Sequence, residues 1–182
     1  MIIIDTETTG KLKPTITDVT QQPKIIEFAG IKLHDDTLEE ISRLTFLVNP
    51  EEKLTPDIVE LTKITDLDLK EQPTFDYFYP KLVDFFLGEK YLIAHNVFFD
   101  ISILCFALER IGRLTQFPYP PNQICTVNKT RSLAGYDLNL TKLYQYMFNE
   151  DFPTKHRAIQ DTEALTRCVK ELIKTNIIKL NK

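Results

Sequence analysis

The stretch Met1-Ile2-Ile3-Ile4-Asp5-Thr6-Glu7-Thr8-Thr9-Gly10 decides the fold that this chain is expected to adopt. Its three isoleucines run directly into two acids separated by one threonine, and an unbroken β-branched run is typical of a strand buried on both faces. Side chains alternate along a strand, so Ile3, Asp5 and Glu7 point to the same side. Two adjacent carboxylates at the end of a buried strand need a positive partner, for which a divalent cation with oxygen ligands is the simplest choice. The alternative at this point is that the strand ends at Ile4 and that both acids are solvated.

Length and composition indicate a single soluble domain that covers residues 1–182. With 43% hydrophobic and 26% charged residues, the chain resembles an ordinary globular protein. It contains no apolar run of the roughly 18–20 residues that a membrane span needs. Its three cysteines, at unrelated spacings, predict reduced thiols and a cytoplasmic protein without membrane contact. The net charge of −4 argues against a broad basic surface that binds nucleic acid, but not against local binding of phosphates through bound metal.

The rest of the chain is predicted to contain strands first and then strand and helix in alternation, which implies a mixed sheet flanked by helices. The first strand and its two successors should form an antiparallel meander. Pro80 predicts a kink or a later start for the helix after Thr74, and residues 114–122 are predicted to form a loop. Further strands are expected at 25–33, 41–48 and 91–94, and helices at 55–63, between 74 and 88, and at 101–111, 125–134, 139–148 and 159–173.

Two of the predicted helices begin with an acid on their apolar side. Asp100 lies four residues before Leu104 and Asp161 lies four residues before Leu165, so each acid heads a buried stripe. Taken alone, each would be interpreted as a first-turn acid that the helix dipole favours. His156 is predicted to precede the second of these helices, either over the same site or as a solvated loop histidine. Together with the acids of the first strand, four inward carboxylates without basic partners would be destabilising unless divalent ions neutralise them.

Three ordered motifs resemble those of a known family. Asp-Thr-Glu-Thr-Thr-Gly at 5–10, His-Asn-x-x-Phe-Asp at 95–100 and His-x-Ala-x-x-Asp at 156–161 resemble the motifs of the four-acid (DEDD) 3′–5′ exonucleases. The match is to the histidine branch, which includes the proofreading subunit of bacterial replicative polymerases. The resemblance implies an α/β, ribonuclease-H-like fold with a five-stranded mixed sheet flanked by α-helices. It also implies two Mg²⁺ or Mn²⁺ ions.

The resemblance assigns roles to individual residues. Lys63 stands where the family has glycine, which puts the turn geometry in question, and the loop before Lys24 is longer than usual. His95 and Asn96 are expected to be structural. The implied metal ligands and catalytic acids are Asp5, Glu7, Asp100 and Asp161, the implied general base is His156, and the implied substrate-binding residues are Thr6, Thr8, Thr9, Leu61, Ile64 and Phe99.

The predicted reaction is hydrolysis of phosphodiester bonds from the 3′ end of DNA, with RNA as the other substrate class, releasing 5′-nucleoside monophosphates in proofreading or repair. Expected partners are nucleic acid with a free single-stranded or frayed 3′ end and a DNA polymerase, although the short tail after the last helix favours an enzyme that acts alone. One alternative is a haloacid-dehalogenase-like phosphatase, which usually has Asp where Glu7 stands and leaves His156 unexplained. The other is a catalytically silent scaffold that binds nucleic acid or a polymerase, against which the complete acid set argues.

Overall fold

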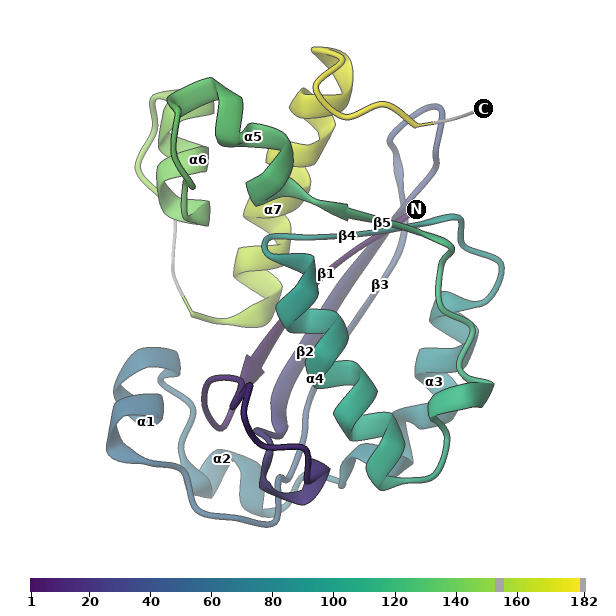
Figure 1. The fold of residues 1–182 in the computed structure, drawn as a ribbon, viewed down its shortest axis with the longest axis vertical. Helices are drawn as coiled ribbons and strands as arrows, with labels where there is room; N and C mark the ends of the chain where they lie inside the picture. The colour runs from purple at the N-terminus through teal and green to yellow at the C-terminus, as the bar shows by residue number, and fades with distance from the viewer. Residues whose placement is uncertain (153–155, 181–182) are drawn as a thin grey trace.

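The computed structural model describes residues 1–152 and 156–180, and its centre is a five-stranded mixed sheet in the order β3-β2-β1-β4-β5 (Figure 1). The sheet is antiparallel between β1, β2 and β3 and parallel between β1, β4 and β5. The predicted meander and mixed sheet are therefore confirmed. The strands are β1 Ile2–Thr8, β2 Ile25–Leu33, β3 Glu40–Leu47, β4 Tyr91–Ala94 and β5 Asn122–Cys125.

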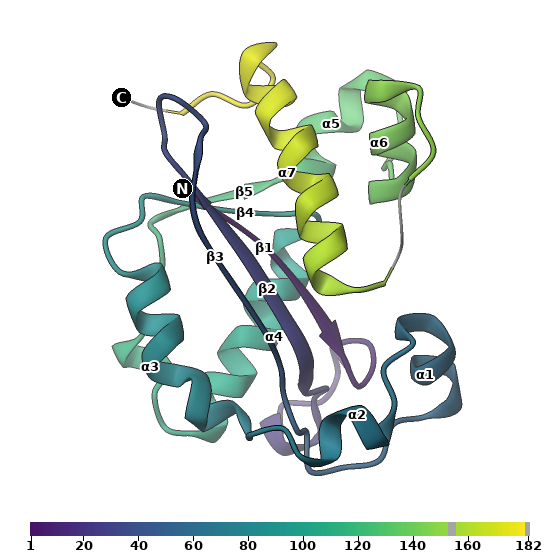
Figure 2. The same cartoon turned by 180° about the vertical axis from the view of Figure 1, so that it is seen from behind.

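Helices cover both faces of this sheet. Two helices, α3 and α4, pack on one face, and α7 packs on the other, as the two opposite views show (Figures 1 and 2). The helices are α1 Pro56–Thr62, α2 Asp66–Lys70, α3 Phe75–Phe86, α4 Val97–Arg110, α5 Thr126–Ala134, α6 Leu140–Phe148 and α7 Ala158–Lys174, with short 3₁₀ turns at Val19–Gln21 and Leu114–Gln116. Among the described residues, none of the helices combines the length and apolar character needed to cross a bilayer.

The side chains of β1 alternate between the two layers as its sequence predicts. Ile2 and Ile4 join the cluster formed with α3 and α4, whereas Ile3 packs with Leu165 and Val169 of α7. All three isoleucines are fully buried, and burying each one stabilises the fold by about 1.5–3 kcal/mol. The next residues of β1 continue the alternation, which directs its two acids toward the α7 face.

Several element boundaries differ from the sequence predictions. The helix α4 begins at Val97 rather than 101, because Asn96 turns the chain with φ of 72° and lets the helix start early. Of the kink or later start predicted for α3, the later start is wrong, since this helix runs from Phe75 and keeps Pro80 inside, with its aromatic face buried against the sheet. Residues 122–125 form the edge strand β5 rather than loop and helix start, and α2 was not predicted.

Candidate active site

The end of β1 and the start of α7 bring three predicted site residues together. Glu7 leaves β1 on the α7 face, and Asp161 lies in the first turn of α7. One ligand atom from each of Glu7, His156 and Asp161 lies within 4.8 Å of the other two. The backbone amide of His156, which has φ of 61°, donates to Asp161 Oδ2 at 3.2 Å. His156 therefore precedes the helix, as predicted, and of the two positions that the sequence left open it takes the one beside the acids.

Asp100 reaches the same end of the sheet from the opposite layer. It lies in the first turn of α4, only 2% exposed, and accepts a hydrogen bond from Thr6 Oγ1 at 2.9 Å. Thr6 alternates with its acidic neighbours and so points to the α4 face. The threonine thus ties this acid to the strand that carries Asp5 and Glu7.

The carboxyl groups at this point repel one another. Burial, followed by the negative charges of Asp161 and Glu27, raises the pKa of Glu7 to about 8. Burial raises the pKa of Asp100 to about 7. The pKa of Asp5 is also raised well above its usual range, first by burial and then by the charge of Asp100. Oxygen donors with excess negative charge are what hard divalent cations bind, so these residues fit a metal centre.

A fifth acid, Glu27 of β2, holds the start of α7 in place. It is 2% exposed and accepts hydrogen bonds from Arg157 Nη2 at 2.9 Å and Nε at 3.0 Å. It also accepts one from the amide of Ala158 at 2.9 Å. The contact orients the residues on either side of Arg157. Sequence reasoning missed this role, although a glutamate inside a strand of buried residues could have indicated it, because buried Glu is rare unless paired.

Among the predicted substrate-binding residues, the threonines shape the end of β1. Thr8 Oγ1 donates to the carbonyl of Gly10 at 2.7 Å, and Thr9 exchanges backbone and side-chain hydrogen bonds with Lys24. These contacts close the base of the loop 10–24. The contacts of these threonines with substrate stay predictions.

The three apolar residues predicted to bind substrate differ in how exposed they are. Leu61, in the last turn of α1, is 46% exposed, and Phe99 is half-buried against the core under α4. Ile64 is buried with Ile26 and Leu69, so it packs in the core and not on the surface. Leu61 and Phe99 thus keep some exposed surface that a ligand could contact.

The turn after α1 keeps a glycine-like conformation although it contains lysine. Lys63 has φ of 60° and ψ of 15°, and its amide donates to the carbonyl of Val59 at 2.9 Å. This is the left-handed region, which costs an L-residue about 1–2 kcal/mol. The chain therefore accepts backbone strain here to keep the turn.

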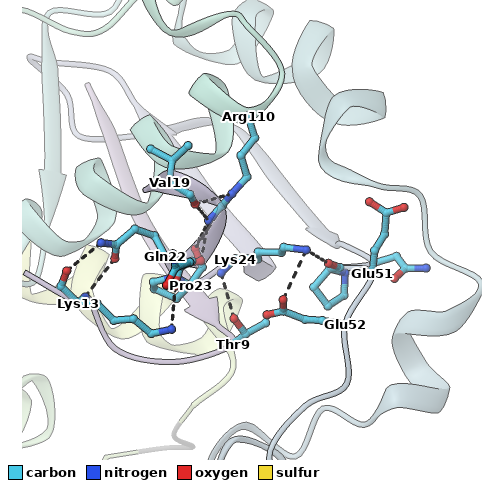
Figure 3. Close-up of polar contacts among 12 residues, drawn as sticks. Thr9, Lys13, Val19, Gln22, Pro23, Lys24, Glu51, Glu52 and Arg110 are labelled. Carbon is cyan, nitrogen blue, oxygen red and sulfur yellow. Dashed lines mark hydrogen bonds and ion pairs between the residues drawn. The ribbon is translucent and has the colours of Figure 1, made fainter. Parts of the chain in front are cut away.

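The long loop 10–24 is anchored to the far end of α4 by Arg110 (Figure 3). The guanidinium donates to the carbonyls of Val19 at 2.5 Å, Gln22 at 2.6 Å and Pro23 at 3.3 Å. The buried amide of Gln22 bonds Lys13 and Ile16 across the loop. The loop next to Thr9 is therefore a hydrogen-bonded unit.

His95 has the structural surroundings that the sequence predicts. Its Nδ1 lies 2.9 Å from Thr126 Oγ1, and burial lowers its pKa to about 4, so it stays neutral near pH 7. The neighbouring Asn96 forms the left-handed N-cap of α4. Both residues connect β4 to the helix that carries Asp100.

Residues 2–169 match the sequence model of the RNase T family, described as exonuclease. The chain belongs to the RNase T exonuclease family. This membership and the fold confirm the predicted DEDD-superfamily exonuclease and the ribonuclease-H-like architecture, and they do not favour a phosphatase of the haloacid-dehalogenase type.

Relatives within this exonuclease family are longer proteins. A Mycobacterium tuberculosis protein named as a candidate bifunctional exonuclease/endonuclease is 31% identical over 94% of this chain, which spans 26% of that protein. The PolC-type DNA polymerase III of Staphylococcus epidermidis is 29% identical over the whole chain, which spans 12% of the polymerase. The chain thus corresponds to one part of these relatives.

Two solved structures share the fold. The nuclease domain of 3′hExo, a DEDDh family member bound to rAMP, has a TM-score of 0.76 at 21% identity, covering 100% of this chain and 95% of that one. Exonuclease X in complex with 5′ overhanging duplex DNA has a TM-score of 0.69 at 22% identity, covering 98% and 93%.

Proposed function

We propose that residues 1–182 form one catalytic domain that removes nucleotides from the 3′ end of DNA and releases 5′-nucleoside monophosphates. The observation that carries the proposal is the convergence at the end of β1, where Glu7, His156 and Asp161 offer ligand atoms within 4.8 Å of one another. The charges of Asp100, Glu7 and Asp161 all raise the pKa of Asp5, and the charge of Asp100 also raises the pKa of Glu7, so Asp5 and Asp100 lie close to this group. An exonuclease of this family would use such a cluster to bind the scissile phosphate.

The proposed metal ligands are Asp5, Glu7, Asp100 and Asp161, and two Mg²⁺ or Mn²⁺ ions match their oxygen donors. When bound, such ions lower the pKa of water and stabilise charge on the reacting phosphate. His156 is the proposed general base, because an imidazole can accept a proton from the attacking water near neutral pH. Its attachment to the start of α7 through Asp161 Oδ2 supports this role.

The proposed substrate is single-stranded or frayed DNA. Leu61 and Phe99 are proposed to contact the terminal nucleotide, with Thr6, Thr8, Thr9 and Ile64 shaping its seat. The similarity to PolC-type polymerases supports a role in proofreading or repair together with a DNA polymerase. A cytoplasmic location is part of the same proposal.

The test is digestion of 5′-labelled and 3′-labelled oligonucleotides of DNA and RNA with Mg²⁺ or Mn²⁺. The 5′-labelled strand should shorten in single-nucleotide steps, and the 3′ label should appear at once as a mononucleotide. Asp5→Ala should abolish both products while the circular dichroism spectrum stays that of the wild type. Full turnover in excess chelator, or undiminished nucleolysis by Asp5→Ala, would contradict the metal assignment.

A further inference from the structure

A groove of about 480 Å³ lies between the start of α4 and the start of α5. We name it the α4–α5 groove. Its polar and aromatic lining includes Asn96, Phe98, Asn128, Arg131, Asp137 and Asn139. None of these residues is among the proposed metal ligands or the predicted terminal-nucleotide contacts.

The groove opens at the same edge of the sheet as the carboxylates. The strands β1, β4 and β5 are parallel, so their carboxyl ends lie along one edge, where open α/β sheets bind ligands. The register pairs Ile3 with Ile93, so counting two residues further along both strands places Asp5 level with His95, just past the end of β4. Neighbouring strands are about 4.8 Å apart, so the groove begins close to the acid cluster. Phe98 also precedes Asp100 by only two residues in the first turn of α4.

The lining has the chemistry that unpaired nucleobases require. Phe98 is 72% exposed, which leaves its ring face available for stacking. Asn96, Asn128 and Asn139 are exposed residues of the same lining. The amides of Asn96 and Asn128 can donate and accept hydrogen bonds, whereas Asn139 Oδ1 caps α6 and leaves its amide nitrogen as a donor. Proteins that bind single strands combine such aromatic platforms with polar groups, because each base has a stacking face.

The charge around the groove differs from that of the whole chain. Residues 122–149 contain three basic residues, Lys129, Arg131 and Lys142, and a single acid, Asp137, whereas the chain has a net charge of −4. All three basic side chains are exposed. Asp137 holds the Arg131 guanidinium through bonds of 2.6 and 3.1 Å. Arg131 in the lining and Lys129 next to Asn128 supply positive charge at the groove, which favours a phosphate backbone over an acidic peptide.

We infer that the α4–α5 groove binds the single-stranded segment on the 5′ side of the scissile phosphate, with one base stacked on Phe98. This inference rests on the proposed function, and it adds a second binding site to it. The helix α1, which carries Leu61, and the helix α5 lie on opposite sides of the end of β1 (Figures 1 and 2). If the 3′-terminal nucleotide lies on the α1 side, the nucleic-acid strand passes over the carboxylates, and its upstream nucleotides reach the groove.

The experiment compares kcat/KM for a dT octamer and a dT dinucleotide, because only the octamer extends far enough to fill the groove. Phe98→Ala should lower the octamer-to-dinucleotide ratio of kcat/KM about tenfold, as expected for one lost stacked base. Arg131→Ala should lower the ratio less and weaken its dependence on salt. Tyr77→Ala is the matched control, since Tyr77 is 60% exposed on α3 and does not line the groove. It should leave the ratio unchanged.

The outcomes separate the groove from the nuclease proposal. Equal losses on octamer and dinucleotide in Phe98→Ala, or no loss on either, would overturn the groove assignment. If the wild type hydrolyses neither substrate, the nuclease proposal fails, and binding of a 5′-fluorescein dT octamer by anisotropy then tests the groove alone. In that assay the Phe98→Ala protein should bind about tenfold more weakly than the wild type and the Tyr77→Ala control, and equal dissociation constants would refute the inference.

Discussion

Without a bound cation, the acid cluster should make the folded protein less stable as pH rises, and Glu7→Gln should remove much of this effect. The pKa of Glu7 in the folded protein is about 8, compared with a usual value of 4.5. Between these values the folded chain keeps a proton that the unfolded chain has lost. Stability therefore falls as pH rises from about 4.5 to 8 and levels off above that, because the folded state binds more protons.

The expected magnitude follows from the difference between the two pKa values. One pKa unit corresponds to 1.36 kcal/mol, so the difference sets an upper limit of about 5 kcal/mol on the loss. Because solvent reaches the half-buried carboxyl of Glu7, we expect about 2 kcal/mol to be measured. For a chain of this length that is a change in Tm of about 4–8 °C.

The assay is thermal and urea denaturation in EDTA at pH 5, 6, 7 and 8. The free energy of unfolding of the wild type should fall across this range, and Glu7→Gln should make this decrease smaller by about 2 kcal/mol. Glu60→Gln, an exposed change on α1, is the control and should retain the wild-type slope. Mn²⁺ should protect the wild type more at pH 8 than at pH 5. Stability that is constant or rises with pH in EDTA, or equal protection by Mn²⁺ at both pH values, would refute the reasoning.

Three further predictions concern the residues around the cluster. Lys63→Gly should raise the free energy of unfolding by about 0.5–1 kcal/mol, because glycine adopts the left-handed turn without strain. Urea denaturation measures this free energy, and a decrease would show that the lysine side chain compensates for the strain. Glu27→Gln keeps an acceptor for the amide of Ala158 but removes the charge that binds Arg157. It should therefore lower the free energy of unfolding by about 1–2 kcal/mol and reduce kcat more than it raises KM. Unchanged kcat would mean that Glu27 does not position the start of α7. His156→Gln should lower kcat about 10²–10⁴-fold and remove the acidic limb of the pH–rate profile, and survival of that limb would assign the base to another group.

Much of the site can be predicted from local pattern. The isoleucine run with its two acids specifies which face of β1 each side chain takes, because strand alternation is a property of neighbouring residues. Helical spacing likewise places Asp100 and Asp161 at the head of buried stripes. These two periodicities were enough to predict four inward carboxylates, and the structure brings them to one end of the sheet.

Other features depended on contacts between distant parts of the chain. The bond from Thr6 to Asp100 joins residues 94 apart, and the bonds from Arg157 to Glu27 join residues 130 apart. The edge strand β5 has little pattern of its own, with a single buried residue, and forms because β4 offers it an edge.

The sequence alone therefore determined the central strand, the inward direction of the acids and their family. Only the tertiary structure decided how α7 is held by Glu27, how Lys63 keeps a glycine-like turn, and where Phe98 remains exposed. The physical reason is that periodicity is set by covalent neighbours, whereas pairing and exposure are set by whichever layers meet when the sheet and its helices pack.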